Sequence, residues 1–348
     1  MISLYKPYMP AELSELENIL RSGSLAYGKW GREFENRLSC FVNINNLMTT
    51  NSFSSAIQLA LTALDLQPGD EVIASPMSCL ASNMPLATYG LKVVWADIDP
   101  KTGTLSPDSV KQKITNNTKL IFHNHFCGYI GYVDEINTTA KEYGLFVIDD
   151  CVEAFGSKYK GNYAGNFGTD ITLFSFQTVR LPNTIDGGAI VFKDKDLYEK
   201  ALLMRDFGIS RNIFRDQDGE ISKDCDIYMK GYGATMNELN SYIGCVAMGD
   251  INTLLAKQKQ QAVKWTNILG ENRITLDRDE IEPNYWVYGV VREDKLDFLR
   301  GMKDKGYYAS GVHLPNSYYS VFGQQGSLPC VEEFYTKFVA IPCGWWME

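Results

Sequence analysis

The 348-residue sequence has only three histidines and no cysteine pair of the Cys-x-x-Cys type. No segment stays apolar over the roughly 20 residues that a transmembrane helix needs. The first residues lack the basic stretch and the apolar run of a secretory signal. The eight cysteines are scattered, which favours reduced thiols. These absences predict a cytoplasmic protein that does not associate with a membrane.

Basic residues are also fewer than acidic residues, 33 against 42. The formal net charge is −9 at pH 7, which argues against a nucleic-acid-binding protein because such proteins present a basic face. The glycine-rich loop of dinucleotide-binding proteins and the Walker lysine loop are absent, and three histidines offer no Ser-His-Asp order. His123, His125 and Cys127 alternate along one face of a predicted strand, but no nearby carboxylate completes a metal site. No metal is therefore expected.

The residues that are present give an ordinary globular composition, 45% hydrophobic and 22% charged. Predicted strands cover 71–75, 92–97, 119–124, 145–150, 171–176 and 188–192, and predicted helices cover 11–22, 53–65, 134–143 and 236–256. This alternation predicts an α/β fold with a large, mainly parallel sheet and helices on both faces. Ligands of such sheets bind beyond the carboxyl ends of the strands. The polar segment 210–230 predicts an exposed loop.

The length of the chain predicts more than one hydrophobic core. We divide it into an N-terminal segment (1–40), a large domain (41–240) and a smaller C-terminal α/β domain (241–348). The C-terminal domain is expected to hold a strand near 285–291 and a helix near 293–305. No shift in composition marks the boundary between the two domains.

Several motifs share their order and spacing with a known family. They lie at residues 51–61, 174–180 (FSFQTVR), 186–191 and 231–238. Together they resemble the DegT/DnrJ/EryC1/StrS family of sugar aminotransferases, which use pyridoxal phosphate (PLP). The resemblance implies the PLP-dependent transferase fold type I, which is aspartate-aminotransferase-like. It also implies a nucleotide-linked keto sugar as substrate, in cell-surface polysaccharide or deoxysugar synthesis. A homodimer with shared sites, across which the N-terminal segment packs, is expected as well.

The resemblance assigns cofactor contacts at three places along the chain. Asp150, at the end of a predicted strand, would pair with the pyridine nitrogen of the cofactor and keep it protonated. The structural alternative for Asp150 is a helix cap. Ser52, Phe53 and Ser54 stand where the family binds the cofactor phosphate at a helix start, although Phe53 replaces the family's glycine. Ser175 matches a family serine that also holds phosphate.

Two further positions depart from the family's pattern. Cys79 stands where an aromatic residue often stacks on the cofactor ring, and Glu153 stands where the family has Gln or His beside the ring hydroxyl. Each has a plain structural alternative, a small buried side chain for Cys79 and a solvated surface carboxylate for Glu153. A carboxylate beside the ring hydroxyl needs a cation close by, so we hypothesise that Arg180 pairs with Glu153.

Arg180 is the decisive departure, because it stands where the family has the lysine that forms a Schiff base with PLP. An arginine stays charged and is a poor nucleophile and a poor base. No lysine lies between Lys160 and Lys193 to take over. PLP or pyridoxamine phosphate (PMP) is therefore expected to bind non-covalently. The predicted catalytic residues are Arg180 and His125, with His125 or a water molecule moving the proton.

His313 lies in a C-terminal segment that the family places near the substrate, so a substrate contact is expected there. Three functions stay open: an aminotransferase-like enzyme acting on a keto sugar, a lysine-independent sugar dehydratase that uses PMP, and a non-catalytic pseudoenzyme or binding subunit. Asp150 and Ser175 favour cofactor binding. Four departures weaken the family's usual cofactor site and favour the pseudoenzyme: Phe53, Cys79, Glu153 and Arg180.

Overall fold

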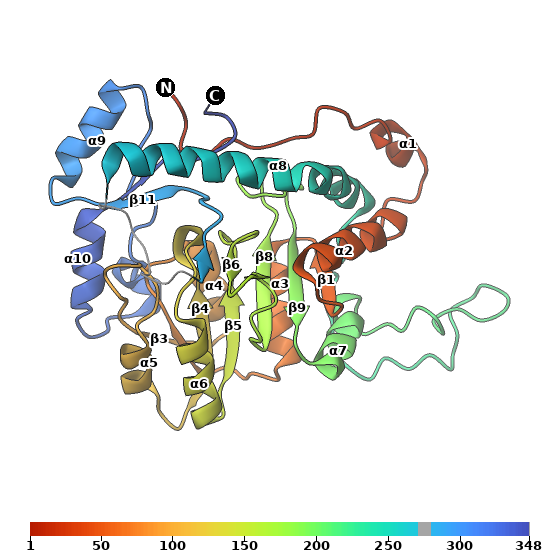
Figure 1. Ribbon diagram of the computed structural model, residues 1–348. Helices are drawn as coiled ribbons and strands as arrows, with labels where there is room; N and C mark the ends of the chain where they lie inside the picture. Colours follow the sequence, from red (N-terminus) through yellow and green to blue (C-terminus); the bar gives the residue numbers. More distant parts are fainter. Residues whose placement is uncertain (271–279, 348) are drawn as a thin grey trace.

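The computed structural model describes residues 1–270 and 280–347 and is built around a seven-stranded sheet (Figure 1). The strands lie in the order β1-β9-β8-β5-β4-β2-β3. Their bounds are β1 Leu47–Thr50, β2 Glu71–Ala74, β3 Lys92–Trp95, β4 Thr118–Asn124, β5 Phe146–Asp150, β8 Ile171–Ser175 and β9 Gly188–Phe192. Only β9 runs against the others, since it pairs antiparallel with both β1 and β8. The prediction of a mainly parallel sheet is confirmed.

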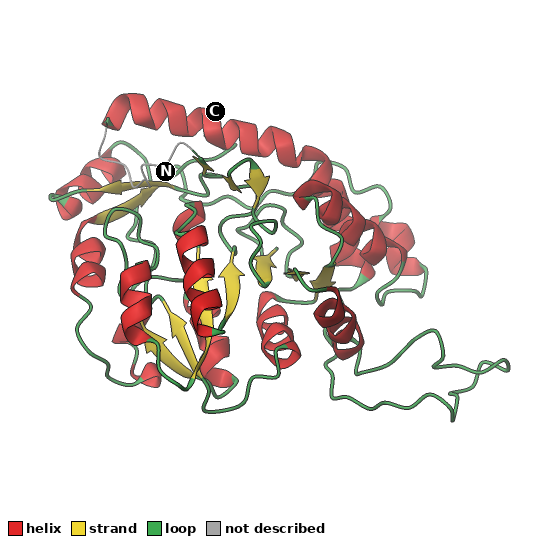
Figure 2. Cartoon of the chain, turned by 60° about the horizontal axis from the view of Figure 1, so that its bottom comes forward, coloured by secondary structure: helices red, strands yellow, loops and turns green. Residues whose placement is uncertain are grey.

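Both faces of this sheet are covered by helices, and Figure 2 shows the strands lying among them. Along β5, Ile148 packs into a cluster with residues of α3 (Phe53–Ala63), α4 (Leu80–Thr88) and α7 (Lys195–Arg205). Its neighbour Val147 points to the other face and packs with α5 (Pro107–Lys113) and α6 (Val133–Tyr143). Successive side chains of a strand alternate between faces, so an apolar pair at 147–148 serves both layers.

A long helix, α8 (Glu238–Leu269), crosses the top of the molecule in Figure 1 and packs against α2 (Lys29–Val42). The Glu238 carboxylate ties the two helices together, because it accepts the backbone N–H groups of Gly28, Trp30 and Gly31 at 2.9–3.1 Å. The predicted boundary at 240/241 falls inside the first turn of α8. Although α8 has 32 residues, no helix in residues 1–270 and 280–347 is apolar enough to cross a membrane.

The C-terminal part contains a two-stranded antiparallel sheet of β11 (Tyr288–Val291) and β12 (Phe338–Ile341), with α9 (Lys295–Asp304) and α10 (Pro329–Lys337). The expected strand and helix are therefore present. A third, three-stranded sheet joins β10 (Ile281–Glu282) to β6 (Lys158–Tyr159) and β7 (Asn162–Tyr163). The packing of the N-terminal segment across a dimer involves a second chain and stays a prediction. Within this chain, Ile2 forms a β-bridge with Tyr307, and Leu4 is buried.

The expected exposed loop is present and protrudes from the body in Figures 1 and 2. It runs between α7 and α8, and two isolated bridges lie within it, Asp206 to Gly233 and Arg215 to Ile221. Apolar side chains along it are exposed, including Phe207, Ile213 and Tyr228.

The outer edge of the sheet at β3 is closed by a side chain. The Gln325 amide donates to the Val93 carbonyl oxygen at 2.8 Å and accepts the Trp95 N–H at 2.8 Å. The side-chain amide thus offers the same donor and acceptor that a neighbouring strand would offer.

Two elements differ from the sequence prediction. Strand β1 is absent from the predicted strands, yet Thr49 and Thr50 within it are fully buried. Glu35 satisfies the polarity of Thr49 by accepting its backbone N–H at 2.9 Å and its hydroxyl at 3.0 Å. The helix predicted at 11–22 is the shorter α1 (Leu16–Arg21).

Candidate active site

The strand ends bring most of the predicted site residues together. Asp150 and Ser175 are the last residues of β5 and β8, and Glu153 follows β5 by three residues. Arg180 lies between β8 and β9, and Cys79 follows β2 and precedes α4. Because β2, β5 and β8 are parallel, these residues meet at one edge of the sheet.

Asp150 is buried with half of its hydrogen-bonding capacity unused. Its Oδ1 accepts the Val152 N–H at 3.1 Å, whereas Oδ2 has no partner among the described residues. Burial raises the pKa of Asp150 to about 6. The nearby Ser82 hydroxyl, which makes no regular hydrogen bond to a described residue, and the Val152 N–H lower this pKa, whereas Glu153 adds a smaller rise and Arg180 a smaller lowering. No helix starts at Asp150, so the helix-cap alternative is reduced to one bond within a turn. The unpartnered oxygen fits an N–H donor of a ligand.

Glu153 is 4% exposed, which rules out the alternative of a solvated surface carboxylate. Its Oε2 accepts the Cys127 N–H at 2.7 Å, and its Oε1 lies 3.0 Å from His313 Nε2 and 3.6 Å from Arg180 Nη2. Burial favours the neutral acid, but His313, Arg180 and the Cys127 N–H outweigh it and lower the pKa of Glu153. The structure therefore brings the hypothesised Arg180–Glu153 pair together and adds His313 to it.

Arg180 is 7% exposed and lies over an aromatic ring, with its Cζ 4.3 Å from the Trp286 ring centroid. The Trp286 ring in turn stacks on Tyr5, with centroids 4.5 Å apart and planes 17° apart. Sequence reasoning missed Tyr5 and Trp286. They carry no motif, and only the fold brings the first residues of the chain to a segment of the small domain.

The residues predicted to bind the cofactor phosphate lie at the start of α3. Ser52 caps the helix, and its side chain accepts the Ser55 N–H at 3.1 Å. Ser54 is exposed and available to a ligand. The Phe53 ring, which takes the place of the family's glycine, is 6% exposed and packs into the core. The first N–H groups of a helix have no partner inside it, so the start of α3 attracts an anion.

Cys79 is partly exposed, and both burial and the nearby Glu153 carboxylate raise the pKa of its thiol. A neutral thiol at this position offers a small soft surface rather than a nucleophile.

His125 does not meet the other predicted catalytic residue. Its ring is 1% exposed, accepts the Gly131 N–H at its Nδ1 (3.1 Å) and places its Nε2 3.4 Å from Asp149 Oδ1. His123 Nδ1 lies 3.1 Å from the same oxygen, and the Thr169 hydroxyl donates to Asp149 Oδ2 at 2.7 Å. These contacts lock His125 into a buried network.

Two statements about these histidines are corrected. A carboxylate does stand beside them, because β4 and β5 pair in a register that sets His123 opposite Asp149. His123, His125 and Asp149 could hold an ion, but His123 Nδ1 already hydrogen-bonds Asp149 at 3.1 Å. His125 Nε2 lies 3.4 Å from the same oxygen without a regular hydrogen bond. Cys127 does not share their strand face, since β4 ends at Asn124 and Cys127 takes a left-handed conformation (φ 56°).

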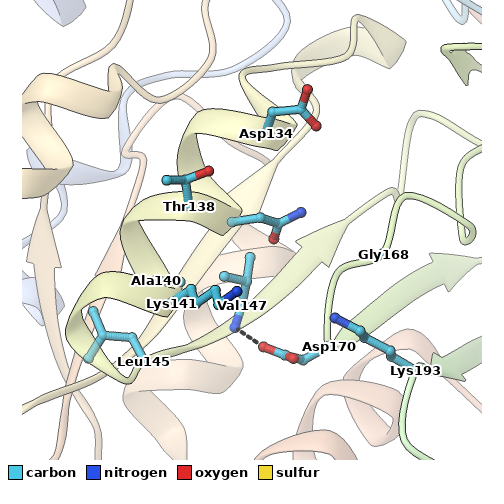
Figure 3. A pocket seen from close by; sticks show the side chains of 10 residues that line it. Asp134, Thr138, Ala140, Lys141, Leu145, Val147, Gly168, Asp170 and Lys193 are labelled. Carbon is cyan, nitrogen blue, oxygen red and sulfur yellow. Dashed lines mark hydrogen bonds between the residues drawn. The ribbon is translucent and has the colours of Figure 1, made fainter.

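A surface pocket of about 600 Å³ lies elsewhere, between α6 and the starts of β5 and β8 (Figure 3). Its wall includes Lys141, Lys193 and Asp170, and the Asp170 carboxylate accepts the Val147 N–H at 2.9 Å. Val147 is near the start of β5, whereas Asp150 is at its end. None of the predicted site residues lines this pocket.

The residues at the strand ends fit a phosphorylated pyridine in part. The unpartnered oxygen of Asp150 suits a ring N–H, and Ser175 with the start of α3 suits a phosphate. Arg180 does not fit a covalent link to the cofactor, because a guanidinium cannot become the neutral amine that such a link requires. The site therefore suits a cofactor held by non-covalent contacts.

Comparisons with known proteins agree with the fold. The model of the DegT/DnrJ/EryC1/StrS aminotransferase family matches residues 9–348. The GDP-perosamine synthase of Escherichia coli O157:H7 is 28% identical, over 99% of this chain and 91% of that protein. A pleiotropic regulatory protein of Geobacillus stearothermophilus is 27% identical, over 97% of this chain and 90% of that protein.

Among solved structures, the sugar aminotransferase CalS13 from Micromonospora echinospora superimposes with a TM-score of 0.92 and 28% identity. The match covers 100% of this chain and 96% of that one, which confirms the fold of PLP-dependent sugar aminotransferases. With the family model spanning nearly the whole sequence, the chain belongs to the DegT/DnrJ/EryC1/StrS aminotransferase family, whose members are PLP-dependent sugar aminotransferases.

Proposed function

We propose that this protein binds PLP or PMP without a covalent link and acts on a nucleotide-linked keto sugar. The observation that carries the proposal is the buried Asp150 carboxylate, whose Oδ2 lacks a partner at the edge of the sheet where ligands of this fold bind. When bound, the cofactor supplies an electron-accepting ring. The residues of the chain have to hold that ring, orient the sugar and move protons.

The geometry suggests which part of the cofactor each of these residues contacts. Asp150 would hold the ring N–H, and Ser52, Ser54 and Ser175 would surround the phosphate. Cys79 would lie beside the ring. These assignments are proposals that rest on position at the strand ends and on the start of α3.

His313 is better placed than His125 to carry a proton near Arg180. Its Nε2 lies 3.0 Å from Glu153 Oε1, and the same oxygen lies 3.6 Å from Arg180 Nη2. A carboxylate that accepts from one ring nitrogen orients the imidazole and leaves the other nitrogen to exchange a proton. We therefore propose a substrate contact and proton carrier at His313, and a supporting role for His125.

The substrate class and the assembly follow the relatives. GDP-perosamine synthase is named for a GDP-linked sugar, and CalS13 is a sugar aminotransferase. We propose a nucleotide sugar of cell-surface polysaccharide or deoxysugar synthesis as the substrate, and a homodimer in the cytoplasm as the working form. The protruding loop between α7 and α8, with its exposed apolar side chains, offers a surface that a second copy could cover.

The proposal is tested by titrating the purified protein with PMP and PLP in a calorimeter, and then by adding 3-keto and 4-keto sugar nucleotides. Binding of PMP followed by loss of the keto sugar supports an enzyme. A product with a new amino group indicates amino transfer, and a product that has lost a hydroxyl indicates the PMP-using dehydratase. Failure of both cofactors to bind would rule out the proposal.

A second candidate, a non-catalytic binding subunit, is favoured by one observation. Arg180, which we propose stands at the family's lysine position, lies over Trp286 and 3.6 Å from Glu153, and these contacts restrict its movement. For this candidate we expect the protein to bind cofactor or nucleotide sugar but to leave the sugar unchanged, with catalysis restored only by an active paralogue.

A further inference from the structure

The guanidinium of Arg180 is held in one orientation by its aromatic neighbours. It lies 4.3 Å from the Trp286 ring centroid, and the Trp286 indole N–H is fixed by the Val179 carbonyl oxygen at 3.1 Å. Tyr5 packs on Trp286 at 4.5 Å. A cation that lies over a ring fixed at two points has little freedom to turn its N–H bonds.

The N–H bonds of this guanidinium are not matched by acceptors. Nη2 lies 3.6 Å from Glu153 Oε1, which is longer than a normal hydrogen bond. Nε and Nη1 are buried and have no acceptor in residues 1–270 and 280–347. A buried cation with free donors is unfavourable, so these donors are suited to an acceptor that a ligand brings.

Glu153 does not require Arg180 as a partner. Its two oxygens already take the Cys127 N–H at 2.7 Å and face His313 Nε2 at 3.0 Å. Arg180 is thus the member of the group with unused hydrogen-bond donors, and its positive charge is only partly offset within the chain.

A small cavity beside Arg180 does not remove the need for an acceptor. It measures about 10 Å³ and is also lined by Gln258 and Trp286, so it holds about one water molecule at most. The Nε–H and Nη1–H bonds leave different edges of the planar group, so one water cannot accept both. At least one donor therefore remains for a ligand.

Asp150 is the complementary group at the same strand ends. Its Oδ2 lacks a donor, just as the Arg180 nitrogens lack an acceptor. A ligand that suits both carries an N–H at one point and an anionic oxygen at another. A 3-hydroxypyridine ring does this when its proton has moved from the hydroxyl to the ring nitrogen.

We propose that Arg180 donates a hydrogen bond to the anionic 3-oxygen of the cofactor ring while Asp150 accepts the ring N–H, so that the site selects the zwitterionic form of the ring. This inference rests on the proposed cofactor binding. It gives Arg180 a binding role that needs neither a neutral amine nor a covalent link. It also explains how a carboxylate at Glu153 is tolerated near an anionic ring oxygen, since the arginine lies next to it.

The test uses two probes that cannot react at the 4-position: 4-deoxypyridoxine 5′-phosphate and its 3-deoxy counterpart, in which hydrogen replaces the hydroxyl. Calorimetry gives the ratio of their dissociation constants, and absorbance reports the protonation form of the bound ring. We expect the wild-type protein to prefer the hydroxyl probe by roughly tenfold or more, the effect of one charge-assisted hydrogen bond. The bound probe should show the zwitterion spectrum.

Variants separate this inference from the proposed function. Arg180→Gln should reduce the preference to about threefold or less, and Asp150→Asn should weaken both probes. Arg21→Gln, at an exposed arginine whose side chain is 78% accessible, is the matched control and should change neither. Equal binding of the two probes by the wild-type protein would overturn the role of Arg180 while leaving cofactor binding intact.

Two other outcomes are decisive. If neither probe binds the wild-type protein, the proposed function fails together with this inference. If glutarate or inorganic phosphate binds in an Arg180-dependent way and does not compete with the hydroxyl probe, the anion at Arg180 belongs to another ligand and the inference is wrong.

Discussion

Replacing Asp150 by Asn should stabilise the folded protein, and the gain should grow with pH. The side chain of Asp150 is buried, and burial raises its pKa from 3.8 to about 6. The folded protein therefore holds this proton more tightly than the unfolded chain does. Between these two values folding takes up a proton, so the contribution of Asp150 to stability is lost as pH rises. Asparagine has no charge to bury and escapes this loss.

The magnitude follows from the two pKa values. Their difference, at about 1.4 kcal/mol per pKa unit, corresponds to about 3 kcal/mol when the carboxylate is fully ionised. Urea unfolding of both proteins in parallel gives the difference in free energy of unfolding at each pH. From about pH 4 to about pH 8 we expect it to move by about 2 to 3 kcal/mol in favour of the variant. Curves that stay parallel over this range would refute the reasoning.

The neighbouring residue provides the control. Burial alone would raise the pKa of Asp149, but His125 and His123 outweigh it and hold the pKa below its ordinary value. The stability that Asp149 contributes is therefore present above its ordinary pKa of 3.8 and lost only at lower pH. Asp149→Asn should lose stability by a constant amount above about pH 5, opposite in sign to Asp150→Asn.

Three further results are expected. Glu238→Ala should lower the free energy of unfolding by about 2–4 kcal/mol in urea unfolding, because three backbone N–H donors at the start of α2 lose the carboxylate that accepts from them; a loss below about 1 kcal/mol would contradict this. Arg180→Lys should restore an amine, so mass spectrometry after borohydride reduction should find PLP attached to the new lysine; no adduct would mean that the pocket excludes the cofactor. Tyr5→Ala should shift the fluorescence of Trp286 and weaken PMP binding, because it removes the ring that stacks on Trp286. Tyr5→Phe keeps the stacked ring and should change neither property. Identical behaviour of the two variants would show that the stack is unimportant.

The strands of the sheet were predictable because apolar runs of four to seven residues are bounded by turn residues. The strand of Gly188–Phe192 was predicted at its exact bounds, and the loop between α7 and α8 was recognised from its polarity. Strand β1 was missed because burial of Thr49 depends on Glu35, a partner on another element. Local pattern carries no information on such a partner.

The candidate site was predictable where it follows the strands. Asp150 ends β5, and Glu153 and Arg180 follow the parallel strands β5 and β8, so their meeting follows from topology. The place of Asp149 beside His125 depends on the register of β4 against β5, which the sequence does not reveal. Tyr5 and Trp286 come from opposite ends of the chain, and their contact requires the finished fold.

The amide of Gln325 has a consequence for how the molecule behaves in a crowded solution. A sheet edge with free N–H and C=O groups is a template on which another chain can add a strand and begin an aggregate. At β3 an incoming strand would first have to displace both hydrogen bonds of Gln325. One side chain thus makes polymerisation through this edge unfavourable, and it does so without adding a charge or shortening the strand.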